Sequence, residues 1–155
     1  MIPELDDRGL LPAGVHSGTW HDIEAAFSKD NRRQKLINSA RNFSCSTLTP
    51  LFPAPLYLAG STFSDKPNPG DIEATIKVDP YQLSHDQLKL MIALQTSHDK
   101  IKDATEIDFY VTLDTPDNND FSQFFQYVGE KTAIIKNLEP KDKRGIVEVK
   151  TWITP

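Results

Sequence analysis

The spacing of apolar residues predicts two helices in the first third of the chain. A four-residue apolar stripe follows Thr19, which can cap a helix at its start, and a second stripe follows Asp30, which can do the same. Pro50 and Pro53 then end the helical region. The two apolar faces are Trp20, Ile23, Ala26 and Phe27, and Leu36, Ile37, Ala40 and Phe43. Both faces are expected to be buried.

Alternation of apolar and polar residues predicts four strands further along the chain. A short apolar strand at 56–59 runs into Gly60, and residues 72–78 and 106–113 alternate with a period of two. A last strand is predicted at 145–152. In the strand at 72–78 the even-numbered positions are apolar and the odd-numbered positions carry the polar side chains.

Two further helices are predicted between these strands. Ser84 and Gln87 match a capping box ahead of an apolar stripe, and residues 117–119 can cap a short aromatic helix. The stripes are Leu88, Met91, Ile92 and Leu94, and Phe121, Phe124 and Phe125. The resulting order α-α-β-β-α-β-α-β is typical of an α+β or α/β domain with a small mixed sheet flanked by helices. Residues 1–18 are predicted to form an extended N-terminal arm.

The length of the chain indicates its number of domains, and its net charge argues against one class of function. A chain of 155 residues favours one domain spanning 1–155, and a net charge of −5 argues against a protein that holds nucleic acid by bulk phosphate neutralisation. We interpret two basic runs as solvated faces. They are Arg32, Arg33 and Lys35, and Lys141, Lys143 and Arg144.

The single cysteine and the N-terminal sequence bear on the compartment. Cys45 is the only cysteine, so no intrachain disulfide is expected, and the reducing cytoplasm fits best. The chain contains no apolar run long enough for a signal peptide or a membrane span, so the mature chain is expected to be the whole chain.

Two carboxylates on one strand face are the main chemical signal. Asp71 and Glu73 are two residues apart on a predicted strand, so they project from the same face and can share one hard cation such as Mg²⁺. A third carboxylate from the next strand would complete such a site, and Asp108 is the candidate with Glu106 as the substitute. The alternative is that these residues form a solvated sheet face after a turn.

A Gly-Ser pair stands upstream of these carboxylates. Gly60 ends the apolar strand, where a glycine allows close backbone approach, and the hydroxyl of Ser61 can meet phosphate oxygens. Lys66, in the loop between Ser61 and Asp71, is a candidate phosphate contact.

This segment, Gly60-Ser61 through Asp71-Ile72-Glu73, resembles the signature of the nucleotidyltransferase superfamily. The resemblance extends to minimal bacterial nucleotidyltransferases and to an uncharacterised prokaryotic family of related proteins, whose Ile-Pro-Glu arm and Leu-Leu-Pro-x-Gly-x-His segment are matched at 2–4 and 10–16. It implies a nucleotidyltransferase-like fold. It also implies an Mg²⁺-dependent enzyme that transfers NMP from an NTP, such as ATP, to a hydroxyl of a protein or small molecule.

The resemblance also implies a second class of function. Glu73 stands where many superfamily members carry Asp, and the chain has no helical substrate domain of the kind found in larger members. Minimal nucleotidyltransferases often pair with helical toxins. The alternative hypothesis is therefore a weakly active or inactive binding module that acts as an antitoxin or regulatory partner.

The remaining candidates receive no catalytic role. The four histidines show no metal-binding spacing, and only His16 is kept in view. Ser61 lacks the GxSxG context of a hydrolase nucleophile. The aromatic residues from 121 to 127 are predicted to belong to the core rather than to a base-stacking surface.

Overall fold

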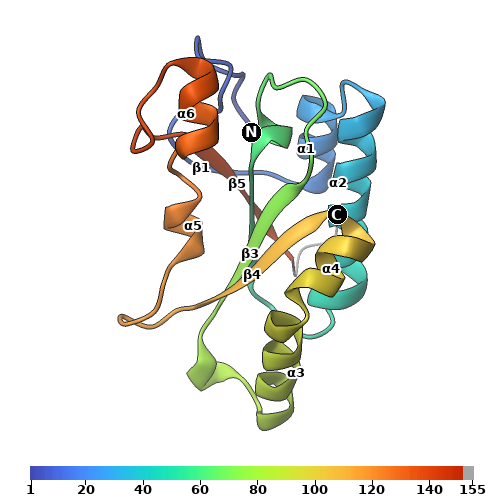
Figure 1. Ribbon diagram of the computed structural model, residues 1–155. Coiled ribbons are helices and arrows are strands. Elements are labelled where there is room, and N and C mark those ends of the chain that lie inside the picture. The colour runs from blue at the N-terminus through green and yellow to red at the C-terminus, as the bar shows by residue number, and fades with distance from the viewer. Residues whose placement is uncertain (152–155) are drawn as a thin grey trace.

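The computed structural model describes residues 1–151 and consists of a mixed five-stranded sheet with helices on both faces (Figure 1). It confirms the predicted α+β fold. The strands are β1 (Gly14–Ser17), β2 (Pro55–Ala59), β3 (Ile72–Val78), β4 (Ile107–Leu113) and β5 (Gly145–Lys150). The helices are α1 (Trp20–Phe27), α2 (Asn31–Phe43), α3 (His85–Thr96), α4 (His98–Thr105), α5 (Phe121–Phe124) and α6 (Glu130–Lys136).

The order of strands across the sheet is β1-β5-β2-β3-β4. β1 and β5 are parallel, as are β3 and β4, whereas β2 is antiparallel to both of its neighbours. In this register Glu73 lies opposite Ala59 on one side and opposite Asp108 on the other. The end of β2 and the starts of β3 and β4 therefore lie side by side at one end of the sheet.

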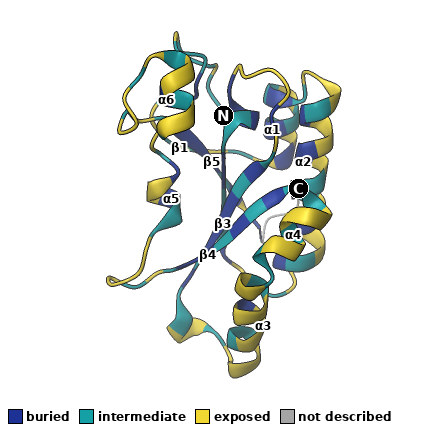
Figure 2. Ribbon diagram, in the orientation of Figure 1, coloured by how far each residue is buried: buried dark blue, intermediate teal, exposed yellow. Residues whose placement is uncertain are grey.

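The main core lies between the sheet and the first four helices. Ile72, Ala74 and Ile76 are at most 1% exposed and join one cluster with Leu36 and Ile37 of α2. Figure 2 shows the buried residues running along β3 and β4. The apolar stripe predicted for this strand thus faces α2, and its polar positions face the side of the sheet where α5 and α6 lie (Figure 1).

Side-chain caps start the helices where the sequence predicts them. Thr19 forms a capping box at α1, Asp30 accepts the backbone N–H of Arg33 at α2, and Ser84 forms a capping box at α3. Each cap satisfies backbone N–H groups that a helix start otherwise leaves unpaired. At α5 the prediction was wrong in detail, because Asp120 is the cap rather than a residue of 117–119.

Three elements lie outside the predicted order. Residues 14–17 of the expected N-terminal arm add β1 to the edge of the sheet, and α4 and α6 were not predicted. Ile92, expected on the buried stripe of α3, is 57% exposed, so that assignment was wrong. The last predicted strand ends at Lys150, and Trp152 lies outside the described residues.

No helix within residues 1–151 is both long and apolar enough to cross a membrane.

Candidate functional site

A buried arginine of α2 holds the Gly-Ser loop in place. Arg33 is 8% exposed, and its guanidinium donates to the carbonyl oxygens of Thr62 at 2.9 Å, Ser64 at 2.7 Å and Lys66 at 2.7 Å. A further bond reaches the Ser61 carbonyl at 3.3 Å. The prediction that this basic run is a solvated face was wrong for Arg33, because its guanidinium is buried against these carbonyls and pairs with the Asp30 carboxylate at 2.8 Å.

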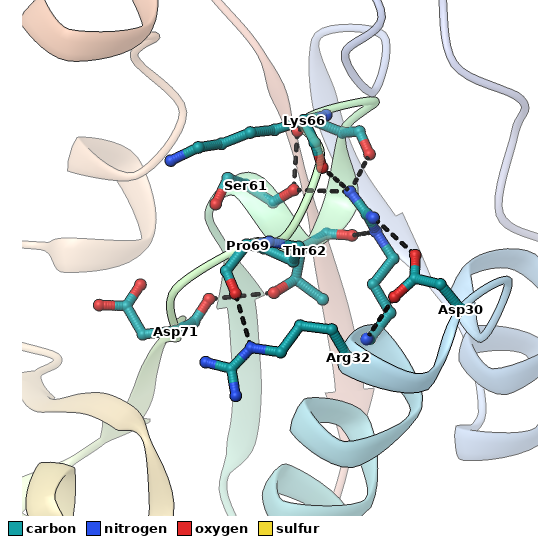
Figure 3. Close-up of polar contacts among 9 residues, drawn as sticks. Asp30, Arg32, Ser61, Thr62, Lys66, Pro69 and Asp71 are labelled. Carbon is teal, nitrogen blue, oxygen red and sulfur yellow. Dashed lines mark hydrogen bonds and ion pairs between the residues drawn. The ribbon is translucent and has the colours of Figure 1, made fainter.

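The far end of the same loop is fixed by the preceding residue of α2 (Figure 3). Arg32 donates to the Pro69 carbonyl at 2.8 Å and to the Gly70 carbonyl at 2.6 Å. The Thr62 hydroxyl donates to the Asp71 carbonyl at 3.0 Å, which joins the two ends of the loop. Both ends of the loop are therefore anchored to a rigid helix. In Figure 3 the side chains of Lys66 and Asp71 extend to the same side, away from α2.

Gly60 occupies a backbone conformation that favours glycine. Its φ is +105°, and a Cβ there would stand 3.6 Å from the backbone nitrogen of Glu73. The conformation, rather than crowding, thus explains the glycine. It turns the chain from β2 into the short helical turn Ser61–Phe63 beside the first residues of β3.

All six site residues predicted from the sequence line one cavity of about 480 Å³. They are Gly60, Ser61, Lys66, Asp71, Glu73 and Asp108. The wall also carries Lys102 of α4, Lys131 of α6 and Arg144, so that four basic side chains surround the carboxylates. We call this space the polar cavity.

Each of the three carboxylates is paired with a basic side chain. The ammonium of Lys102 lies 3.4 Å from Asp71 Oδ2 and 3.6 Å from Asp108 Oδ2. Nε2 of His98 lies 2.7 Å from Asp108 Oδ1, and Arg144 donates to Glu73 Oε2 at 3.0 Å. Lys102 thus bridges Asp71 and Asp108, and Arg144 contacts Glu73.

Burial and charge shift two pKa values in this cavity. Burial raises the pKa of Glu73 above its ordinary value, and the charges of Asp71 and Asp108 add to the rise, although Arg144 opposes it. For Lys102 burial lowers the pKa, but Asp108 and Asp71 outweigh it, so that the net shift is upward.

Of the two candidates for the third carboxylate, the structure places Asp108 in the polar cavity. Glu106 is the left-handed C-cap residue of α4, with a φ of 59°, rather than part of the strand. Its carboxylate forms ion pairs with Arg32 and, at 3.4 Å, with Lys35. The hypothesis of Glu106 as the substitute ligand therefore finds no support in this geometry.

Sequence analysis missed His98, Lys102 and Arg144. Lys102 follows His98 by four residues, so one helix turn directs both toward the neighbouring strand, but recognising this required α4 to be predicted. Arg144 was assigned to a solvated run, whereas its side chain also donates to the Phe125 carbonyl at 3.0 Å. His16, by contrast, bonds the Pro12 carbonyl at 2.6 Å and does not line the polar cavity.

A second cavity adjoins the polar cavity. It measures about 620 Å³, and Phe124, Phe125, Tyr127, Val128 and Pro140 provide its apolar wall. Glu73 and Arg144 line both cavities. We call this space the aromatic cavity. The prediction that these aromatics are core residues holds for Phe125, which is buried, and was wrong for Phe124, which is 71% exposed.

Comparison with known proteins places the chain in a family. Residues 3–150 match a family of unknown function, DUF6932. The chain belongs to this family. The match covers the Gly-Ser loop, all three carboxylates and the basic residues paired with them. No curated protein matches the DUF6932 chain, and no solved structure does. The function of this DUF6932 protein must therefore be argued from the site itself.

The donor chemistry of the polar cavity in this DUF6932 protein suits a hard divalent cation. Three carboxylates face one space, and carboxylate oxygens are the ligands that Mg²⁺ prefers. Within residues 1–151, however, no three acidic, histidine or cysteine side chains are close enough together to hold a metal ion. The residue types fit Mg²⁺, and Lys102, His98 and Arg144 contact the same carboxylates.

Proposed function

We propose that this protein is an Mg²⁺-dependent nucleotidyltransferase that transfers NMP from an NTP to a hydroxyl group. One observation carries the proposal. The six residues selected from the sequence signature line a single cavity, together with the side chains of Lys102, Lys131 and Arg144. A space lined by both carboxylates and basic side chains suits a ligand that combines a divalent cation with phosphate groups.

In this proposal the Gly-Ser loop and its basic neighbours bind the triphosphate. The hydroxyl of Ser61 and the ammonium of Lys66 are the phosphate contacts. The anchoring of the loop by Arg32 and Arg33 supports this role, because it fixes the loop carbonyls and leaves the Lys66 side chain free to extend into the cavity. Hydrogen-bond donors that are already in position stabilise a phosphoryl group during its transfer, because the protein does not have to rearrange.

All three carboxylates would hold the metal, and Asp108 has a second role in the transfer. Asp71, Glu73 and Asp108 would hold Mg²⁺, which when bound neutralises the charge of the phosphate oxygens. Asp108 also accepts the proton of the acceptor hydroxyl. The acceptor oxygen then forms a bond to the α-phosphorus, the bond from that phosphorus to the bridging oxygen breaks, and pyrophosphate leaves.

Calorimetry with ATP and GTP tests the proposal. Binding to the full chain is measured with and without Mg²⁺, and the Mg²⁺-dependent gain in affinity is compared between the wild type and Asp71→Asn. The wild type is expected to gain affinity with Mg²⁺, and the variant is expected to lose at least roughly tenfold of that gain. Without Mg²⁺ the variant should bind no more weakly than the wild type, since it has lost a negative charge.

Asp103→Asn is the matched control, because Asp103 is an exposed acidic residue of α4 that does not line the polar cavity. It should behave like the wild type. The proposal is wrong if neither nucleotide binds in the presence of Mg²⁺. It is also wrong if Asp71→Asn keeps the full Mg²⁺ effect.

The pairing of every carboxylate with a protein cation favours a second candidate function. Lys102 pairs with Asp71 and Asp108, and Arg144 pairs with Glu73, as expected for a binding module that has no need of a metal. Ile134 and Ile135 of α6 are 82% and 72% exposed, which gives an apolar surface to an otherwise polar helix. A helical partner such as a toxin would cover these side chains.

Co-expression with a helical protein encoded by a neighbouring gene tests this candidate. A complex that elutes as one species in size-exclusion chromatography should survive Asp71→Asn and be lost in the double variant Ile134→Ser, Ile135→Ser. A complex that depends on Asp71, or one that tolerates both serines, would contradict the binding-module hypothesis.

A further inference from the structure

The aromatic cavity differs in chemistry from the polar cavity beside it. Its lining is mainly apolar, with Glu73, Glu130, Lys141 and Arg144 as the charged residues at its wall. Ser61, Lys66 and Lys131, which line the polar cavity, are not part of it. The aromatic cavity therefore lacks Ser61 and Lys66, the two phosphate contacts proposed above, and its mainly apolar wall suits an apolar body.

Phe124 and Tyr127 offer ring surfaces to this space. Phe124 is 71% exposed and also lines a neighbouring hollow with Phe121 and Asn119, so its ring stands between two depressions. The ammonium of Lys143 lies 3.8 Å from the centroid of the Tyr127 ring, and this contact fixes the ring from one side. Aromatic rings held in this way bind flat apolar groups by stacking.

Each of the two cavities is large enough to hold a ligand of its own. They measure about 620 and 480 Å³, and each falls within the roughly 300–1,000 Å³ of a small-ligand site. The residues that line both are Glu73, Val128, Gly129, Glu130 and Arg144. Of the three carboxylates, Glu73 alone lines the aromatic cavity, so a group that enters from this side reaches the acidic cluster there.

We propose that the aromatic cavity binds the acceptor, a small molecule with a hydroxyl group on a flat aromatic body. The ring lies against Phe124 and Tyr127, and the hydroxyl points past Glu73 and Arg144 toward the polar cavity. Glu73 can accept the hydrogen bond of that hydroxyl. The role as acceptor rests on the proposed nucleotidyl transfer, and the affinity for an aromatic ring does not.

Titration of the full chain with 2-naphthol, followed by the fluorescence of this probe, tests the proposal. The probe is flat and carries one hydroxyl. Phe124→Ser is expected to weaken its binding about tenfold, the loss of one stacking partner. Ile92→Ser is the matched control, because Ile92 is 57% exposed on α3 and does not line the aromatic cavity. It should change the affinity less than twofold.

A second titration with saturating ATP and Mg²⁺ assigns the role of the site. Retained binding of 2-naphthol supports the acceptor, and competition by ATP overturns it, because the cavity would then hold the nucleobase. No binding by the wild type, or equal binding by Phe124→Ser, overturns the proposal as a whole. If 2-naphthol binds in this Phe124-dependent way and ATP does not bind at all, the aromatic site stands and nucleotidyl transfer fails, which separates the two proposals.

Discussion

The guanidinium of Arg144 donates to Glu73 Oε2 at 3.0 Å, and this pair forms the wall between the polar and aromatic cavities. Arg144 comes from the residue before β5 and Glu73 from β3, with β2 between these strands. The pair therefore joins two segments across the middle strand of the sheet. The pKa of Glu73 is set by burial, which raises it, and by the charge of Arg144, which lowers it.

We expect Glu73→Gln to become more stable than the wild type as the pH rises. The pKa of Glu73 is raised by burial, so the folded state favours the protonated carboxyl, and its stabilising contribution is lost as the pH rises through the folded pKa. The difference in unfolding free energy should be near zero below about pH 4 and grow toward neutral pH, by less than about 1 kcal/mol because solvent screens the group.

Urea denaturation from pH 4 to pH 8 measures this difference. Arg144→Met is the complementary variant, since removal of the guanidinium takes away the one charge that lowers the pKa of Glu73. The stability of Arg144→Met should fall more steeply with pH than that of the wild type. A glutamine variant that is equally stable or less stable at neutral pH would show that Arg144 outweighs burial.

Arg33→Met is expected to lower the unfolding free energy by about 3 kcal/mol, because it leaves several carbonyl groups of the loop without a donor. Arg41→Met is the matched control. Arg41 is also on α2 but forms a partly exposed pair with Glu24, so it should cost less than about 1 kcal/mol. Chemical denaturation compares the two. Equal effects would mean that Arg33 acts only as a surface charge.

The sequence predicts the positions of the carboxylates but not their partners. The period-two pattern at 72–78 places Asp71 and Glu73 on one face, and burial of the alternate residues confirms the phase of the strand. The partners come from elements with a weak local signal. Helix α4 buries no residue fully, and its apolar content is too low for periodicity to reveal it. Lys102 and His98 were missed for this reason.

The role of Arg33 could not be predicted from local pattern either. A run of basic residues near a helix start is usually solvated, and the sequence near Arg33 does not differ from that expectation. Its burial depends on loop carbonyls from residues 61–66, which lie about thirty residues away in the sequence and are brought to it by the fold. Glu106 shows the opposite error. The alternating pattern includes it in the strand, but in the structure it is the left-handed C-cap residue of α4.

Lys102→Gln should strengthen Mg²⁺ binding by the full chain. The ammonium of Lys102 lies between Asp71 and Asp108, so it competes with a cation for the same carboxylates. Its loss should raise the affinity roughly fivefold, the effect of about 1 kcal/mol for a unit charge near the surface. Lys100→Gln, on an exposed residue of the same helix that does not line the polar cavity, should leave the affinity unchanged. Calorimetric titration with Mg²⁺ measures both. An unchanged or weaker affinity in Lys102→Gln would show that Lys102 is needed to hold the two carboxylates in position.

Gly60→Ala tests whether backbone strain positions the Gly-Ser loop. The φ of +105° is costly for any residue with a Cβ, so the unfolding free energy should fall by about 2 kcal/mol. Gly70→Ala is the matched control, because no atom lies within 4 Å of the added Cβ in the same loop. It should be nearly neutral. If relaxation of the strain moves the loop, Gly60→Ala also loses Mg²⁺-dependent nucleotide affinity while Gly70→Ala keeps it. If Gly60→Ala is stable and keeps its full nucleotide affinity, the glycine is dispensable. The hydrogen bonds from Arg33 would then be enough to fix the loop.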